Sequence, residues 1–474
     1  MQKLRGGILS ALLLSTATVV GAETGPPTSL PNLFPFPNPH GILKTFNESG
    51  KLDLTGPFFQ SLGTNGRSCA TCHQASDAWS VSAAHVAERF EQTQGLDPIF
   101  RTNDGSNCDQ HIDTKTVEGR RHAYSLLTSR GLIRIALPVP ANAEFEVVSV
   151  SNPYKCDDTS TLSMYRRPLP STNLRFLTTV MWDGRESSLQ TGTIPIKPTG
   201  GQNPDDLLTD LRHQSLDATN GHAQASTQLS DTQKQQIVNF EMGLSTAQAF
   251  DFGAGSLETH GARGGPVALS NQFFYVGIND PLGQNPVPNK PFDPVIFTLF
   301  TTTWADEQFH NKNRASILRG QTLFNLHPID IKDVAGINDV LGVKTLRGTC
   351  GTCHDSPNVG NHSIIAPLNI GIADVANKLN PLGLDYLPVI KLKNTATGEK
   401  VSTTDPGRAL VTGKWADIGK FKGPILRGLS ARAPYFHNGS AESLKDVIEF
   451  YNVRFGMGLT EREQADLAAF LSTL

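Results

Sequence analysis

Residues 66–74 read GRSCATCHQ, and within them Cys69, Cys72 and His73 form the pattern C-x-x-C-H. Two thiols and an imidazole at this spacing are typical of three kinds of site: a redox dithiol, half of a zinc site, or the attachment point of a c-type haem. The pattern alone does not distinguish these three kinds of site, so other features of the chain are needed to choose between them.

A second copy of the pattern occurs in GTCGTCHDS, with Cys350, Cys353 and His354. Zinc sites usually take both ligand pairs from one short stretch, whereas Cys72 and Cys350 are separated by most of the chain. The spacing therefore favours two separate haem attachment sites, in which His73 and His354 are the axial iron ligands. We expect two covalently bound haem c groups as cofactors.

Residues 1–22 have the pattern of a secretory signal peptide. Lys3 and Arg5 precede an apolar stretch that ends in the small residues Gly21 and Ala22. The apolar stretch is too short for a membrane anchor and is interrupted by hydroxyl side chains. The sequence thus predicts an exported, periplasmic protein without a membrane anchor, and this compartment suits covalently held haem better than a labile thiol site.

The overall composition excludes several other functions. The chain has 474 residues and a formal net charge of -3, so bulk charge offers no attraction to nucleic acid. It contains no phosphate-binding glycine loop, no H-E-x-x-H and no G-x-S-x-G. Nothing in the sequence supports a calcium site. Redox chemistry has no rival among these motifs.

Two further cysteines, Cys108 and Cys156, lie outside the haem motifs. In an exported protein the default for such a pair is a disulfide, and a pair of free thiols is the alternative. In either case we interpret the two cysteines as structural.

Amphipathic helices are predicted at several places in the chain. Apolar side chains recur at helical spacing in 314–325, 230–248, 444–451 and 460–474, and Leu244 shares the apolar face of the second of these ranges. Capping boxes begin the second and fourth ranges. Long connections rich in Gly and Pro separate the helices. We therefore expect a mainly α fold.

The motifs divide this helical chain into two haem-bearing halves. We expect an N-terminal haem domain over 23–305, with an inserted segment around 80–170, and a C-terminal haem domain over 306–474. The inserted segment lies between the first haem motif and the stretch VMWDGRESSL, residues 180–189.

Three stretches resemble one known superfamily. VMWDGRESSL, FKGPILRGLSARAPYFHNGSAESLKDVIEFYN and LTEREQADLAAFLSTL look like segments of the bacterial dihaem cytochrome c peroxidases, whose superfamily also contains the MauG-type enzymes. The resemblance implies two cytochrome c-like domains. The N-terminal haem would meet hydrogen peroxide, and the C-terminal haem would relay electrons from a small redox protein of the cytochrome c or cupredoxin type.

The resemblance also assigns roles to the motif W-D-G-R. The tryptophan of this motif lies between the two haems in the family, so we expect Trp182 to couple the two irons, although an isolated tryptophan is more often a core side chain. Arg185 is expected to hold the local structure.

The chain departs from the family at the distal side of the N-terminal haem. With the family's glutamine aligned at Gln214, Gln224 takes the place of the usual glutamate, and a glutamine cannot transfer a proton. His222, two residues earlier, is therefore our candidate for the distal acid/base, because imidazole titrates near neutrality. The alternative is a histidine in a surface loop. His85 is a second candidate, as a displaceable sixth ligand or simply a residue on a helix face.

The sixth ligand of the C-terminal haem is also unusual. Where family peroxidases carry a methionine after P-Y-F-H-x-G, this chain has Tyr451, on the apolar face of its helix. By the resemblance Tyr451 is expected to bind the iron, as in the MauG-type branch, and a phenolate ligand would lower the potential of the haem. Without the resemblance an inward tyrosine is usually a core ring. Met457 is the alternative ligand.

Together these features predict an exported dihaem c-type peroxidase that reduces hydrogen peroxide. Two alternatives stay open. One is a MauG-type or rubber-oxygenase-like enzyme that acts on an organic or protein substrate in a pocket shaped by the inserted segment. The other is a dihaem electron carrier without catalysis, which needs no open iron position.

Overall fold

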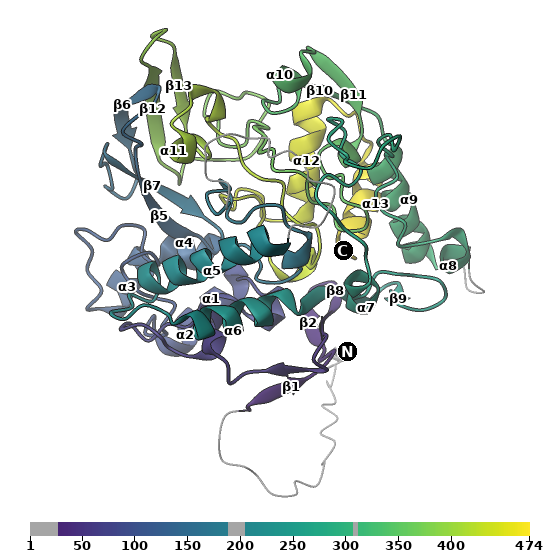
Figure 1. Ribbon diagram of the computed structural model, residues 1–474, viewed down its shortest axis with the longest axis horizontal. Coiled ribbons are helices and arrows are strands. Elements are labelled where there is room, and N and C mark those ends of the chain that lie inside the picture. Colours follow the sequence, from purple (N-terminus) through teal and green to yellow (C-terminus); the bar gives the residue numbers. More distant parts are fainter. Residues whose placement is uncertain (1–26, 188–203, 307–310) are drawn as a thin grey trace, which may run out of the picture.

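Helices and small sheets are mixed along the chain in the computed structural model, which describes residues 27–187, 204–306 and 311–474 (Figure 1). The predicted signal peptide, residues 1–22, lies outside the described residues. The expected mainly α fold is not confirmed, because strands occur in both halves of the chain. Two cytochrome c-like domains remain an expectation.

Six α-helices of the described residues have three turns or more: α2 (Ala83–Thr93), α5 (Pro204–Gly221), α6 (Asp231–Met242), α9 (Lys312–Leu326), α12 (Leu444–Phe455) and α13 (Glu461–Leu471). The others are shorter: α1 (Cys69–Cys72), α3 (Val117–Ala123), α4 (Ser125–Arg130), α7 (Pro266–Ser270), α8 (Thr302–Asp306), α10 (Asn338–Leu341) and α11 (Ala409–Thr412). Single 3-10 turns occur at η1 (Pro57–Phe59), η2 (Ala75–Asp77), η3 (Leu174–Phe176), η4 (Cys350–Thr352), η5 (Trp415–Asp417) and η6 (Leu429–Ala431).

The strands are β1 (Ser29–Pro31), β2 (Phe36–Asn38), β3 (Gly41–Asn47), β4 (Lys51–Asp53), β5 (Ile133–Pro138), β6 (Phe145–Ser151), β7 (Thr161–Arg166), β8 (Leu244–Asp251), β9 (Gly255–Ser256), β10 (Ile329–Lys332), β11 (Thr345–Gly348), β12 (Val389–Asn394) and β13 (Lys400–Thr403). In the described parts of the chain they form five antiparallel sheets, with strand orders β1-β4, β10-β11, β13-β12-β6, β2-β3-β8-β9 and β5-β7.

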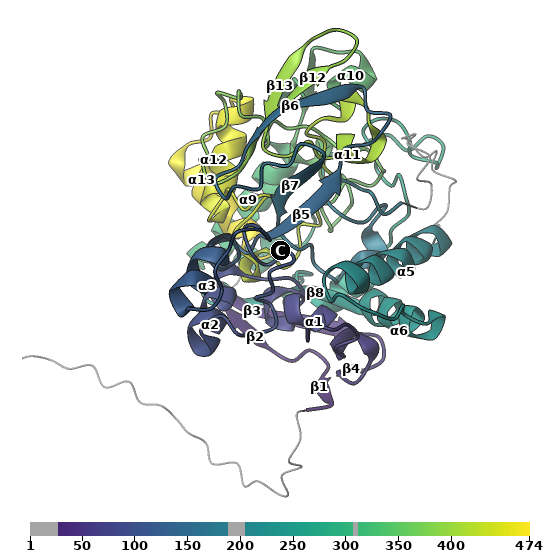
Figure 2. The same cartoon turned by 90° about the vertical axis from the view of Figure 1, so that its left-hand side faces the viewer.

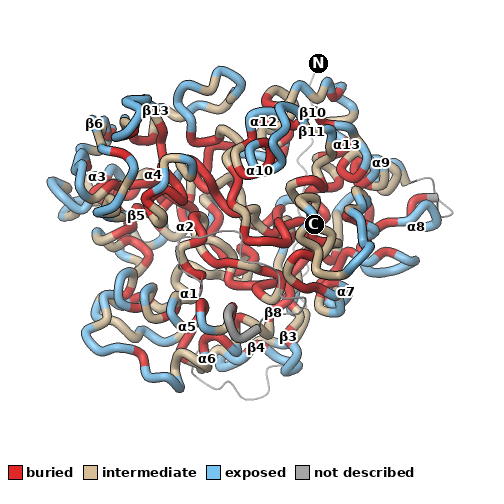
Figure 3. Tube along the Cα trace, turned by 45° about the horizontal axis from the view of Figure 1, so that its top comes forward, coloured by how far each residue is buried: buried red, intermediate tan, exposed pale blue. Residues whose placement is uncertain are grey.

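The predicted helices in the C-terminal half are confirmed, and they pack together. The range 314–325 falls within α9, and the two later ranges form α12 and α13. Helices α9 and α13 approach closely at Gly320, where a Cβ atom would lie 2.0 Å from the backbone oxygen of Asp466. The helices enclose a buried apolar cluster that includes Phe297 and Phe470. In Figure 3 the buried segments, in red, lie mostly in the interior of the molecule, and the exposed segments, in pale blue, lie mostly at its edge.

The prediction for 230–248 is only partly right. The capping box is present, with the Ser230 hydroxyl accepting a hydrogen bond from the backbone N–H of Gln233 at 3.2 Å, and α6 follows. The helix ends at Met242, however, and Leu244 begins β8, so Leu244 does not share a helix face with Ile237. Gly243 separates the two elements, and the residues after it pair with β3 instead of continuing the helix.

The inserted segment is joined to the C-terminal half through a shared sheet. Strand β6 of the insertion pairs antiparallel with β12 from the C-terminal half, over Phe145–Ser151 and Val389–Asn394. Figures 1 and 2 show this sheet at one end of the molecule, above β5 and β7. The predicted boundary at 305/306 therefore does not separate two sets of strands, because the insertion belongs to a sheet whose other strands come from beyond it.

A disulfide between Cys108 and Cys156 connects two loops of the insertion, with a Cα–Cα distance of 5.8 Å. This is the pairing that the sequence predicts, and both cysteines are buried. The bond closes a loop of 48 residues.

Replacing both Cys108 and Cys156 by serine should lower the free energy of unfolding by about 4 kcal/mol, because the unfolded chain regains the entropy of an open loop. Denaturant unfolding of the double variant measures this loss. Treatment of the wild-type protein with a reductant is the matched control, and a midpoint unchanged in both would contradict the prediction.

Across the described ranges, no helix combines the length and the apolar character that crossing a bilayer requires.

Candidate haem sites

The N-terminal motif lies on the short helix α1 and its C-cap. Ser68 and Thr71 form a capping box that fixes the first turn. The ring of His73 follows, and its Nδ1 lies 2.9 Å from the backbone oxygen of Trp79. A carbonyl oxygen can only accept a hydrogen bond, so the ring nitrogen in this contact must be the donor. The ring proton is therefore on Nδ1. Nε2 is then the nitrogen with a free lone pair, as an iron ligand requires.

The C-terminal motif repeats this construction. Thr349 and Thr352 form the capping box, and His354 follows the turn η4. Its Nδ1 lies 2.6 Å from the backbone oxygen of Gly360. Both histidines are thus held by a carbonyl six residues later in the chain, which fixes ring orientation and tautomer in the manner typical of histidines that bind metal.

Burial keeps the groups of both motifs neutral. It lowers the pKa of His73 and of His354 to about 4, so both rings are neutral imidazoles at physiological pH. Burial also raises the pKa of the Cys69 and Cys353 thiols to about 12. Thioether attachment of a haem consumes both thiols, so buried, protonated thiols are compatible with it.

Each motif opens onto its own cavity. The N-terminal cavity, which contains about 1580 Å³ of free space continuous with solvent, is bounded by Cys69, Cys72 and His73. The C-terminal cavity contains about 1470 Å³ and is bounded by the second motif. Two cysteines, a neutral imidazole and a mainly apolar wall at each cavity are the groups that a covalently attached haem requires. The residues present therefore fit a haem at each motif.

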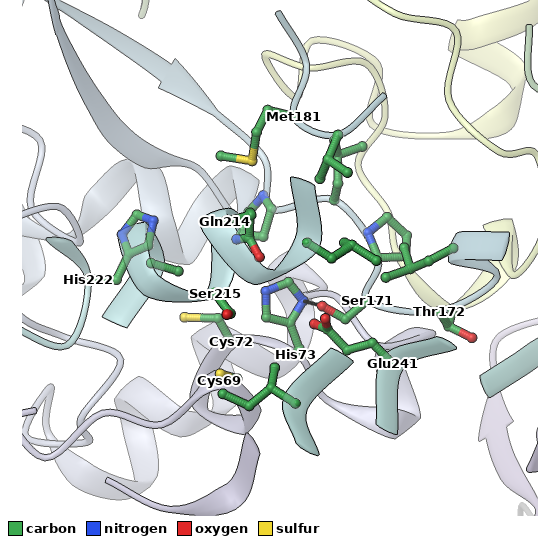
Figure 4. Close-up of a pocket in the computed structure, with 18 of the residues that line it drawn as sticks. Cys69, Cys72, His73, Ser171, Thr172, Met181, Gln214, Ser215, His222 and Glu241 are labelled. Carbon is green, nitrogen blue, oxygen red and sulfur yellow. Dashed lines mark hydrogen bonds between the residues drawn. The ribbon is translucent and has the colours of Figure 1, made fainter. Parts of the chain in front are cut away.

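The candidate distal residues come from helix α5. Gln214 and Ala218 lie one turn apart, and His222 follows at the same spacing just beyond the helix end, so all three face the N-terminal cavity. Figure 4 shows Gln214 and His222 around the same space as the His73 ring. Gln224 lies beyond the helix end at a φ of 54°, is exposed, and does not line this cavity.

His222 is held by a carboxylate from the inserted segment. Its Nδ1 contacts Asp104, which also forms a buried ion pair with Arg67. Although burial opposes it, the hydrogen bond from His222 and the charge of Arg67 lower the pKa of Asp104. An ionised Asp104 accepts the Nδ1 proton of His222 and leaves Nε2 free to exchange a proton. Sequence reasoning missed Asp104, which is 118 positions from His222.

The His73 ring has a second contact that no sequence motif indicates. The hydroxyl of Ser171 lies 3.1 Å from His73 Nδ1, and Glu241 of α6 lies beside this serine (Figure 4). Glu241 is buried, and burial raises its pKa to about 7 in spite of a hydrogen bond from Ser171. These residues are far from the motif in the chain and show no spacing that would reveal them.

His85 lies apart from the N-terminal cavity. It is in α2, and its Nδ1 is 2.5 Å from Asp77. The hydrogen bond that the His85 ring donates to Asp77 raises the pKa of His85. His85 is not among the residues that bound the cavity, so the structure places it on a helix face beside a carboxylate.

Trp182 lines both cavities. Its indole N–H donates to the backbone oxygen of Arg167 at 2.8 Å, and its ring centroid lies 6.1 Å from that of His437. This position suits the predicted role between two haems, which stays a prediction. Arg185 forms an ion pair with buried Asp183 at 3.0 Å.

Both candidate sixth ligands line the C-terminal cavity, as do the cysteines of its motif. Tyr451 comes from α12, and Met457 follows the end of that helix. Burial, with smaller contributions from Cys353 and Cys350, raises the pKa of Tyr451, so the phenol is protonated until a cation displaces its proton. His327 Nε2 contacts the backbone oxygen of Met457 at 3.0 Å, and the Met457 side chain packs against two buried apolar clusters.

The ferric spectrum distinguishes these two ligands. If Tyr451 binds the iron, Tyr451→Phe should abolish the phenolate-to-iron charge-transfer band and raise the potential of this haem, because phenolate stabilises ferric iron. Met457→Leu should leave the spectrum unchanged. A methionine-to-iron band that persists in Tyr451→Phe and disappears in Met457→Leu would defeat the tyrosine assignment.

Comparison with known proteins finds similarity to cytochrome c peroxidases over parts of the chain. Searching protein-family models gives no match. Among curated proteins, the chain is 37% identical over 91 residues to cytochrome-c peroxidase IdrP1 of Denitromonas iodatirespirans, covering 17% of this chain and 24% of that protein. It is 31% identical over 144 residues to cytochrome-c peroxidase IdrP2 of the same organism, covering 27% and 37%. It is 27% identical over 145 residues to cytochrome c551 peroxidase of Nitrosomonas europaea, covering 30% and 36%.

The chain thus spans no more than 37% of the length of these relatives. A solved MauG-like protein associated with microbial copper homeostasis aligns over 96% of this chain and 95% of its own, at 15% identity and a TM-score of 0.36. A TM-score this low does not establish a common fold. The matched segments are thus similar to parts of bacterial cytochrome c peroxidases, in agreement with the resemblance seen in the sequence.

Proposed function

We propose that the protein is an exported, periplasmic dihaem c-type peroxidase. It would reduce hydrogen peroxide with electrons from a small redox protein of the cytochrome c or cupredoxin type. One peroxide takes up two electrons and two protons and gives two waters. The relatives named cytochrome-c peroxidase support this assignment, and so do the two C-x-x-C-H motifs, each beside its own cavity.

The observation that carries the proposal is the difference between the two cavities. The N-terminal one contains a group that can exchange protons, His222, with its supporting carboxylate Asp104. The C-terminal one is mainly apolar and offers side chains that can fill the sixth iron position, Tyr451 and Met457. The first arrangement suits reaction with peroxide and the second suits electron transfer.

The residues of the N-terminal cavity would act on the protons of peroxide. A bound haem supplies the iron and the redox chemistry. His222 Nε2 would accept a proton from peroxide and return it to the departing oxygen, while Asp104 would keep the ring in the correct tautomer. Gln214 lies on the face of α5 that continues to His222. Its amide would form a hydrogen bond with peroxide, as donor or as acceptor, without a change in its own protonation.

Substrate would reach His222 through a second, more open hollow. This hollow is bounded by Arg134 and Leu137 of β5 on one side and by Asp217 and His222 on the other. It shares His222 with the N-terminal cavity, so it connects the candidate acid/base to the surface. Its polar rim suits a small hydrophilic substrate.

The same hollow is the observation that favours the alternative. Because a strand of the inserted segment forms one wall, the insertion could admit an organic substrate, as in MauG-type or rubber-oxygenase-like chemistry. A dihaem electron carrier, in contrast, has no use for a proton-exchanging pair beside an accessible cavity.

Steady-state kinetics test the proposal. The holoprotein is mixed with reduced cytochrome c, and peroxide is added. We expect oxidation of two cytochrome c molecules per peroxide consumed. Protein without peroxide and peroxide without protein are the controls. Absence of peroxide-dependent oxidation with both cytochrome and cupredoxin donors would refute the peroxidase, and oxygen uptake with organic substrates would then support the alternative.

A further inference from the structure

The wall between the two cavities contains a buried lysine without a counter-charge. Lys422 is 7% exposed and lines both the N-terminal and the C-terminal cavity. Its backbone N–H donates to the backbone oxygen of Trp182 at 2.9 Å. Within the described residues its ammonium group has neither a hydrogen-bond partner nor an ion-pair partner, and the charge that acts on it is that of Arg432.

Two arginines in the same region are also without acidic partners among the described residues. Arg427 lines the N-terminal cavity and donates to the backbone oxygens of Asn358 and Gly264. Arg432 lines the C-terminal cavity and donates to the backbone oxygen of Ile425 at 2.9 Å. In both guanidinium groups the Nε atom has no partner. We call Lys422, Arg427 and Arg432 the cationic wall.

Burying these three positive charges without anions beside them is energetically unfavourable. Moving a charged group out of water costs several kcal/mol unless an opposite charge compensates it. Burial lowers the pKa of Lys422 to about 8 and that of Arg427 to about 9. The chain supplies no carboxylate to this wall among its described residues, so the compensating anions must come from what the two cavities bind.

A haem carries two propionate carboxylates, which are anions of the required kind. We propose that the cationic wall binds haem propionates on both of its sides, and that Lys422 is shared between the two haems. The lysine is a binding residue for the cofactors and does not touch the reacting oxygen atoms. This inference relies on the proposed function only in requiring a haem at each motif.

One shared charge has a consequence for the reduction potentials. Reduction adds an electron to a haem, and a nearby positive charge stabilises the reduced form. In Lys422→Met, both haems should therefore become harder to reduce. We expect a roughly tenfold fall in the reduction equilibrium constant of each, which corresponds to about 59 mV for a one-electron couple.

The experiment is a spectroelectrochemical titration of the holoproteins, after haem content has been confirmed for each variant. Lys422→Arg keeps the charge and should retain both wild-type potentials, which separates loss of charge from disturbance of Trp182. Lys445→Met, at an exposed position of α12 that lines neither cavity, removes one positive charge and should change neither potential. A shift in only one haem, or in neither, overturns the sharing of Lys422.

If Lys422→Met fails to retain haem, a second measurement keeps the proposal testable. The propionate bending modes in the resonance Raman spectrum report hydrogen bonds to the propionates. They should shift for both haems between the wild-type protein and Lys422→Arg, because guanidinium and ammonium donate differently. Unchanged modes would refute the proposal. Neither readout requires peroxide turnover, so a failed peroxidase assay and a failed Lys422 assignment can be told apart.

Discussion

Replacing His222 by alanine is expected to slow the reaction of the ferric protein with peroxide by roughly 100-fold or more, while both haems stay bound. The physical reason is that the proton of peroxide must move during the reaction, and the described N-terminal cavity offers His222 as an imidazole held by a carboxylate. Stopped-flow mixing with excess peroxide, followed at the Soret band, measures the rate.

Two further variants sharpen this test. Asp104→Asn keeps the size of the side chain and removes its charge, so it should slow the reaction by about tenfold and move its pH profile, because the tautomer of His222 is no longer fixed. His122→Ala removes an exposed histidine of α3 and should leave the rate unchanged. If His222→Ala reacts as fast as the wild type, the proton transfer belongs to another group, such as Gln214 with a water molecule.

Replacing both cysteines of one motif by alanine should remove one haem and leave the other. The variant Cys69→Ala/Cys72→Ala is expected to keep about half of the haem and to lose its reaction with peroxide. The variant Cys350→Ala/Cys353→Ala should also keep about half and still react with peroxide, but without turnover from a donor protein. The pyridine haemochrome assay measures haem per chain.

The paired design supplies its own control, because the two variants differ only in which motif is removed. Equal loss of peroxide reactivity in both, with one haem retained in each, would contradict the division of roles. Retention of the wild-type haem content in either variant would contradict covalent attachment at that motif.

Local features of these sites could be predicted from the sequence. The C-x-x-C-H pattern contains within five residues all that one haem attachment needs, and the structure places each motif against a cavity. The helices α12 and α13 could be predicted because their signals are also local. Their apolar residues recur at helical spacing, and the two residues of each capping box lie three positions apart. The pairing of Cys108 with Cys156 could be predicted because they are the two cysteines outside the haem motifs.

Features that depend on distant segments could not be predicted. Asp104 reaches His222 from the inserted segment, and Ser171 with Glu241 reaches His73 from two other elements. None of these contacts joins residues at a characteristic separation in the sequence, so no motif reveals them. The strand β8 escaped prediction because Leu244 continues the helical spacing of α6, whereas pairing with β3 decides its conformation. The sheet that joins β6 to β12 is hidden for the same reason.

The departure from the family pattern at Gln224 shows how the sequence and the structure complement each other. The sequence showed that the expected glutamate is missing and made His222 the candidate. The structure shows why His222 can act as the acid/base: its Nδ1 contacts Asp104, and its ring lines the cavity. Gln224 does not line this cavity.

In the proposed reaction, peroxide takes its two electrons from the two haems of one chain. The most direct test is to reduce the holoprotein fully, remove excess reductant, and mix it with one equivalent of hydrogen peroxide in a stopped-flow spectrometer. We expect the reduced bands of both haems to disappear, with one peroxide consumed per two haems oxidised. Oxidation of only one haem by that equivalent of peroxide, or no oxidation faster than that caused by dissolved oxygen, would contradict it.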